Sequence, residues 1–178
     1  SAAWDKALVF WTWMWLGNLP QLDPKSPAIA YIDLKTRRVV VNPDKVMEMG
    51  VESSLDFILT HEMGHATLYP HSLSVQAKLV LLLKETFPKL SPKLLNIFTD
   101  LLINHHLTNK EPGLIPQGAA IYSAMGLSSA SVRADPAFVF YVMCLEEGAW
   151  RLPPYTLTGE AGKELERLIP KCRDEAQE

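Results

Sequence analysis

Cysteine is scarce in this chain, and the cysteines present form no recognisable motif. Cys144 and Cys172 do not make a CxxC pair, so they give no signal for a cysteine-ligated metal site or a thiol redox site. A small secreted scaffold held together by disulfides is also a poor fit. Such sparse cysteine usage is typical of the reducing cytosol, and the sequence therefore predicts a cytoplasmic protein.

The chain also lacks a large excess of charge of either sign. Lys and Arg total 17 and Asp and Glu total 20, for a net charge of −3. The short basic group Lys35, Arg37 and Arg38 is interpreted as the tip of a hairpin. Proteins that bind nucleic acid usually show a clustered basic face, so no nucleic-acid partner is predicted. With 48% hydrophobic and 21% charged residues, residues 1–178 are expected to form a single globular domain.

Hydrophobic runs long enough to cross a membrane are missing too. The apolar stretch Leu8–Leu16 is well short of the about 20 residues that a membrane-spanning helix needs. It predicts instead an N-terminal helix within residues 1–17, with Trp4, Trp11 and Trp15 on or near its buried stripe. Contact of this helix with a membrane surface is an alternative that the pattern does not favour.

The remaining elements are mainly helical. Two β-rich runs within residues 28–42 predict a hairpin. Residues 18–27 are predicted to be a connector and residues 109–134 a long loop, because both segments are rich in residues that break regular structure. The C-terminal part, residues 135–178, is predicted to hold two more helices. Helices are also expected at residues 43–49, 52–69, 72–87 and 91–108. The expected fold class is thus a helix-dominated α+β fold with one small sheet or hairpin.

The residues that point to chemistry are His61-Glu62-Met63-Gly64-His65, an HExxH sequence. Residues four apart on a helix lie one turn above each other, so His61 and His65 can direct their imidazoles at one zinc ion. Glu62 lies beside the ligand line, where it can act as the general base toward zinc-bound water. The sequence therefore predicts one Zn²⁺ per chain. The alternative is a pair of core histidines with other partners, which is costly without a purpose.

A catalytic zinc site needs a third protein ligand and an open position. Asp100 is the preferred candidate, because Asn96, Asp100 and Asn104 form a polar stripe at every fourth position of the otherwise apolar helix 91–108. If this helix packs against the HExxH helix, Asp100 can reach the metal and the two asparagines can orient the ligands. The alternative is a polar stripe that faces solvent.

Four other residues remain candidates for the third ligand: His71, Glu85, His105 and His106. His71 has the spacing found in metzincins, and Ser123–Met125 resembles their Met-turn. However, Leu68 stands where that pattern needs a glycine with positive φ. Glu85 lies at a thermolysin-like distance along the chain, but the aspartate that usually follows one turn later is missing.

The segment HEMGH followed by NIFTDLLIN resembles a prokaryotic metallopeptidase domain that often precedes von Willebrand factor A-type modules. In that family HExxH is followed by an N-x-x-x-D-x-x-x-N helix, and the resemblance covers roughly residues 52–108. It implies a zincin-like fold, with a pair of helices around the zinc and a small sheet beside the motif helix. It also implies that Asp100 is the third ligand.

The function expected from the sequence is that of a zinc-dependent metallohydrolase, most readily a metallopeptidase acting on a peptide or protein. A β edge within residues 28–33 or 37–42 could pair with an extended substrate. The alternative is a zinc-stabilised interaction module that docks through its aromatic N-terminal helix. Glu62 argues against that alternative, because a structural zinc site needs no general base. Candidates for stabilising an oxyanion are Tyr122, Arg133, Tyr155 and His105.

Overall fold

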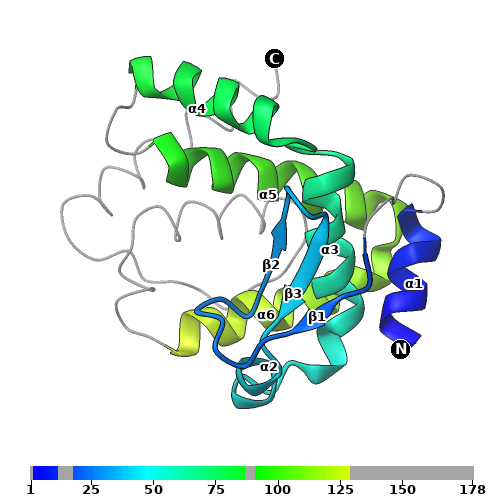
Figure 1. The fold of residues 1–178 in the computed structure, drawn as a ribbon. Coiled ribbons are helices and arrows are strands. Elements are labelled where there is room, and N and C mark those ends of the chain that lie inside the picture. Colours follow the sequence, from blue (N-terminus) through cyan, green and yellow to red (C-terminus); the bar gives the residue numbers. More distant parts are fainter. Residues whose placement is uncertain (1, 12–17, 87–90, 129–178) are drawn as a thin grey trace, which may run out of the picture.

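The computed structural model describes residues 2–11, 18–86 and 91–128. Six helices and three strands lie in these ranges, together with 3-10 turns at Glu52–Ser54 and Pro112–Leu114. Their bounds are α1 Ala2–Trp11, β1 Gln21–Leu22, β2 Ala30–Asp33, β3 Arg38–Val41, α2 Pro43–Glu48, α3 Leu55–Thr67, α4 Leu73–Thr86, α5 Ser91–Lys110 and α6 Ile115–Ser128. The predicted helix-dominated α+β class with one small sheet is confirmed (Figure 1).

The sheet has the strand order β1-β3-β2. Strands β2 and β3 form the predicted hairpin, with Ala30 opposite Val41 and Asp33 opposite Arg38. The prediction of a plain connector at residues 18–27 is wrong at β1, which pairs in parallel with β3. This strand is only two residues long and exposed on both, so it carries no alternating pattern that a sequence could reveal. Because β3 is central, β2 is an edge strand of the sheet within the described residues.

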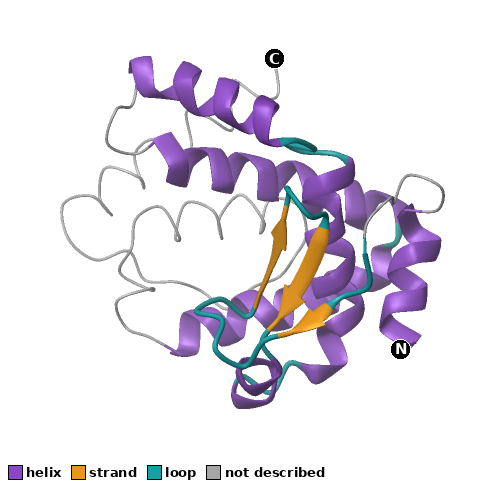
Figure 2. Cartoon of the chain, viewed as in Figure 1, coloured by secondary structure: helices purple, strands orange, loops and turns teal. Residues whose placement is uncertain are grey.

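Helix α3 packs against β2 and β3 and also contacts α1, α5 and α6 (Figure 2). Its buried residues include Phe57, Ile58, Leu59 and Met63. At Gly64 an added Cβ would lie 2.7 Å from Cγ2 of Ile103 on α5. Glycine is therefore needed at this position because a side chain would prevent α3 and α5 from approaching so closely.

The two ends of α3 are held by groups from outside the helix. Ser54, at the N-cap position, makes no side-chain hydrogen bond to the first turn. The backbone amide of Phe57 donates instead to Oε1 of Gln117 on α6, at 3.1 Å. At the other end, Arg37 Nη2 donates to the carbonyl oxygen of Ala66 at 2.9 Å, which satisfies one of the orphan carbonyls of the last turn.

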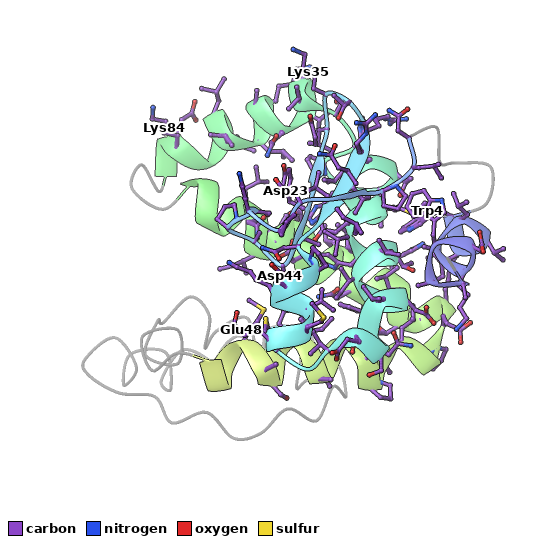
Figure 3. The ribbon with its side chains drawn as sticks, turned by 60° about the horizontal axis from the view of Figure 1, so that its bottom comes forward. Trp4, Asp23, Lys35, Asp44, Glu48 and Lys84 are labelled. Atoms are coloured by element: carbon purple, nitrogen blue, oxygen red, sulfur yellow. The ribbon has the colours of Figure 1, made fainter. Side chains whose placement is uncertain are left out.

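The aromatic N-terminal helix docks on α3. Trp4 and Trp11 are 4% and 1% exposed, and Trp11 Nε1 donates to the carbonyl oxygen of Thr60 at 2.8 Å. Figure 3 shows Trp4 on the side of α1 that faces the other helices. It also shows Lys35 projecting from the tip of the β2–β3 hairpin. The predicted buried stripe is confirmed for these two tryptophans, whereas Trp15 lies outside the described residues.

The prediction of a long loop at residues 109–134 is wrong for most of its length, because Pro112–Leu114 and α6 are helical. Pro116 stands in the first turn of α6, where the missing amide hydrogen is not needed. Leu114, Ile121 and Tyr122 are buried, so tertiary packing outweighs the weak local preference of a Gly-, Ser- and Pro-containing segment.

The rest of that loop, residues 129–134, and the helices expected in residues 135–178 lie outside the described residues, as do Cys144 and Cys172. The cytoplasmic location therefore stays a prediction. Among the described helices, none combines the length and the apolar character needed to traverse a lipid bilayer.

Candidate metal centre

A cleft of about 650 Å³ opens between the edge strand β2 and the helices α3, α5 and α6. His61, Glu62, His65 and Asp100 all line it, and Tyr122 of α6 lies in the same wall. The motif residues and the polar stripe, which are far apart in the sequence, therefore meet in one hollow of the protein.

The two histidines and Asp100 present a compact set of metal-ligating atoms. One such atom from each residue lies within 4.8 Å of the other two. Asp100 Oδ1 is 3.2 Å from His65 Nε2 and 3.7 Å from His61 Nε2. On a tetrahedron with bonds of about 2.0–2.1 Å, ligand atoms stand about 3.3–3.4 Å apart. The two measured separations bracket this value, so the arrangement could hold a metal ion.

A hydrogen bond on the far side of its ring fixes the orientation of His61. Its Nδ1 lies 2.8 Å from Oδ1 of Asn104, and Asn104 is fully buried. An amide oxygen only accepts, so Nδ1 carries the proton and donates it. The lone pair of neutral His61 is then on Nε2, which is the nitrogen that faces Asp100. This is the tautomer that a metal ligand needs.

His65 is oriented in the same way by a backbone group. Its Nδ1 lies 3.1 Å from the carbonyl oxygen of Tyr69, which again can only accept a hydrogen bond. The lone pair of neutral His65 therefore lies on Nε2 as well. Tyr69 follows α3 directly, and the turn at this point is closed by the amide of His71, which donates to the carbonyl oxygen of His65 at 2.9 Å.

Asp100 has one oxygen occupied and one left over. Oδ2 accepts a hydrogen bond from Nδ2 of Asn96 at 3.0 Å. With both histidines in the neutral form described above, Oδ1 is buried and has no hydrogen-bond partner. Buried polar atoms without a partner are rare in proteins, and this one points at the two histidine nitrogens. An ion bound between the three residues would satisfy it, which is the strongest sign that the residues present fit a metal.

Without a metal, the three residues form a charged cluster. Burial lowers the pKa of His61, but hydrogen bonding and charge from Asp100, with a smaller effect of Glu62, outweigh it and raise the pKa to about 9. Burial raises the pKa of Asp100, and the two histidines lower it by more, so that the net shift is downward. The Asp100 carboxylate thus stabilises a positive charge on the neighbouring imidazole. The same negative charge would stabilise a bound cation.

Glu62 lies beside this cluster without belonging to it. The backbone amide of Ile32 on β2 lies close enough to the Glu62 carboxylate to favour the charged form. Burial raises the pKa of Glu62 above its ordinary value, although His65, His61 and the Ile32 amide partly counteract the effect. The side chain borders the same cleft as the three candidate ligands, where it can reach a proton on a bound water.

The structure does not bring the other proposed third ligands to the cluster. In the described part of the chain, the only group of three or more potential ligands is His61, His65 and Asp100. His71 is exposed, in a turn with φ of 53°, and Glu85 is exposed on α4. His105 Nε2 accepts from Asn109 at 2.9 Å. His106 stacks on Trp11 with ring centroids 5.5 Å apart.

The two remaining sequence interpretations fare differently. Ser123–Met125 lies inside α6 and makes no Met-turn, so the metzincin-like interpretation loses its second feature. Of the oxyanion candidates, Tyr122 lines the cleft and His105 does not. Arg133 and Tyr155 lie outside the described residues.

Three contributors to the site were missed at the sequence level. The carbonyl of Tyr69 and the amide of Ile32 are backbone groups, and no residue type signals them. Tyr122 was considered only as an oxyanion candidate, and its hydroxyl accepts a hydrogen bond from Nδ2 of Asn104 at 3.0 Å. A helical spacing of Ile115, Ala119 and Tyr122 could have revealed that this residue faces the core.

The contact between Asn96 and Asp100 leads to a first prediction. Asn96→Ala removes the donor to Oδ2 and lets the carboxylate rotate, so zinc affinity should fall by about tenfold, the lower end of the range for groups that orient ligands. Competition with a chromophoric chelator measures this. Asn109→Ala is the matched control on the same helix, where the Asn109 side chain is hydrogen-bonded to exposed His105. This variant should leave zinc affinity unchanged. Equal losses in both variants would contradict the role of Asn96.

Comparison with known proteins gives no relative for this chain: no family model, no curated protein and no solved structure matches it.

Proposed function

We propose that this protein is a zinc-dependent metallohydrolase, and specifically a metallopeptidase with Glu62 as its general base. The observation that carries the proposal is the set of two imidazoles and one carboxylate, with an unsatisfied buried oxygen on Asp100, at the edge of an open cleft. This donor set suits a metal ion but does not by itself select one metal. We assign zinc as the metal from the types of its donor atoms.

The donor types support zinc. Two histidines with one carboxylate is a ligand set of zinc hydrolases, and such catalytic sites leave one position open for water or substrate. Calcium and magnesium prefer oxygen ligands. Because the ligating atoms lie in the wall of the cleft, a fourth position can remain accessible. A structural zinc site would instead be closed by a fourth protein ligand, and the described residues offer none at the cluster.

The chain's own residues then divide the chemical work. Zinc, when bound, lowers the pKa of a coordinated water and polarises the carbonyl that is attacked. His61, His65 and Asp100 hold the metal, and Glu62 removes a proton from the attacking water. The Ile32 amide lies beside the Glu62 carboxylate and favours its charged form. After the attack, Glu62 can pass the proton to the leaving amine, which completes the hydrolysis of the bond.

The edge strand β2 supports a peptide as the substrate. Residues 28–32 line the cleft, and the amide of Ile32 points toward Glu62. Backbone groups two residues apart point to the same edge of a strand, so those of Ala30 also face away from β3. An extended peptide can pair with such an edge through its main chain, which would lay its scissile bond along the row of Glu62 and the metal ligands.

The zincin-like fold and the resemblance to the prokaryotic metallopeptidase domain belong to this proposal. They agree with a helix pair, α3 and α5, that carries the ligands beside a small sheet. The alternative, an interaction module that docks through α1, has less support because Trp4 and Trp11 are buried against the chain's own core. The same burial gives no reason to assign a membrane surface as the partner of that helix.

The proposal is tested by metal content and hydrolysis together. Purified protein should contain about one zinc per chain by plasma mass spectrometry, and His65→Ala should lose it, since two ligands bind zinc poorly. The wild type should cleave members of a library of fluorogenic peptides, and 1,10-phenanthroline should stop the cleavage until zinc is restored. A wild-type protein that refuses added zinc, or that binds zinc through four protein ligands and cleaves nothing, would overturn it.

A further inference from the structure

We propose that Tyr122 of α6 is a positioning residue of the metal centre, which acts on His61 through Asn104. The inference rests on the metal-binding part of the proposed function and not on the choice of a peptide as substrate. It extends the site from the motif helix α3 and the stripe on α5 to α6, a segment whose sequence predicts a loop.

Three buried side chains form a polar chain from α6 to the ligands. The Tyr122 hydroxyl accepts from Nδ2 of Asn104 at 3.0 Å, and Oδ1 of Asn104 accepts from Nδ1 of His61 at 2.8 Å. The residues Tyr122, Asn104 and His61 are 7%, 0% and 8% exposed. Water cannot readily replace either bond at this depth, so the loss of one bond affects the next residue of the chain.

The orientation of the Asn104 amide decides which nitrogen of His61 carries the proton. With the oxygen toward His61, Nδ1 donates and Nε2 offers its lone pair to a metal. With the amide turned over, an N–H would face Nδ1, and the proton of neutral His61 would move to Nε2, where it blocks metal binding. In the structure the hydroxyl of Tyr122 accepts from the NH₂ group, and this hydrogen bond holds the amide with its oxygen toward His61. A phenyl ring in its place would remove that hydrogen bond and leave the amide freer to turn over.

Packing around the polar chain keeps Tyr122 in register with His61. The ring of Phe57 contacts both residues: it is 5.7 Å from the His61 ring in a stacked arrangement and 6.5 Å from the Tyr122 ring, edge to face. Gln117, also on α6, accepts a hydrogen bond from the Phe57 amide. The contacts of Gln117 and of the Tyr122 ring thus fix α6 to α3. The Tyr122 hydroxyl has the separate role of bonding the Asn104 amide.

The direct test is Tyr122→Phe, which removes the hydroxyl and keeps the ring. Zinc affinity, measured by chelator competition, should fall by about tenfold, the size expected for a group that orients a ligand. In the metal-free protein, the ¹⁵N chemical shifts of the His61 ring, recorded above the pKa of its imidazolium, should move from the Nδ1–H form toward the Nε2–H form. Unchanged affinity together with unchanged shifts would overturn the proposal.

Gln117→Ala serves as the matched control on the same helix. It removes a contact between α6 and α3 without touching the polar chain, so the His61 tautomer should stay as in the wild type. If this variant shifts the tautomer and weakens zinc binding as much as Tyr122→Phe does, then loosening of α6 explains both results and the hydroxyl has no role of its own.

A double-mutant cycle with Asn104→Asp shows whether Tyr122 acts through Asn104. A carboxylate accepts through either oxygen and can hold the Nδ1–H form of His61 however it is turned. In that background Tyr122→Phe should have little further effect on zinc affinity, so the two changes are not additive. An additive loss of about tenfold would mean that Tyr122 acts elsewhere in the cleft. Both measurements concern binding and tautomer, so they stand even if no peptide is cleaved.

Discussion

Glu62→Gln is expected to retain zinc and to lose peptide hydrolysis by about 100- to 10,000-fold, the usual contribution of a general base. The carboxylate borders the cleft next to the three candidate ligands but is not one of them. The amide of glutamine has almost the same shape. What it cannot do is take a proton from water. The measurements are zinc content and the rate of cleavage of a fluorogenic peptide.

A control separates loss of the base from loss of the fold. Glu85→Gln makes the same chemical change at an exposed residue of α4 that is outside the cluster, and it should cleave as fast as the wild type. Circular dichroism should be the same for both variants. If Glu62→Gln keeps zinc and still cleaves at the wild-type rate, Glu62 is not the base, whatever the metal does.

The sequence was sufficient to predict the part of the site that lies on α3, because one helix supplies it. The spacing of His61 and His65 fixes their relative positions as soon as the segment is helical, and the apolar pattern around them makes the helix evident. The polar stripe of α5 was the second reliable signal. Asn96, Asp100 and Asn104 stand out at every fourth position of a helix rich in leucine and isoleucine, and the structure brings all three to the cleft or its ligands.

Other parts could not be read from the sequence, for identifiable reasons. The metal-facing tautomer of His65 depends on the carbonyl of Tyr69, and every residue type carries such a carbonyl. The effect of the edge strand on the pKa of Glu62 comes from the amide of Ile32, and every residue except proline carries such an amide. Helix α6 was missed because its glycine and proline suppress local helix preference, while its stability comes from burial of Ile121 and Tyr122 against distant elements.

Removal of Asp100 should produce the largest change in metal binding among the variants that keep both histidines. Asp100→Ala leaves two imidazoles and no charged ligand, and loss of even a group that only orients a ligand costs about 10–100-fold in affinity. The expected loss for Asp100→Ala is therefore at least about 100-fold. Chelator competition gives the affinity, and the rise of the melting temperature on adding zinc gives a second reading, because a ligand that binds only the folded state stabilises it by mass action.

The competing assignments supply the controls for Asp100. His71→Ala and Glu85→Ala remove the two alternatives that lie on or beside α3 and α4, and both should bind zinc as the wild type does, because both side chains are exposed and neither joins the cluster. Asp100→Asn keeps the shape and the hydrogen bond with Asn96 but removes the charge, so its affinity should fall between those of Asp100→Ala and the wild type. If zinc affinity survives Asp100→Ala and collapses in His71→Ala or Glu85→Ala, the metal is held by a different third ligand. The unsatisfied oxygen of Asp100 would then need another explanation.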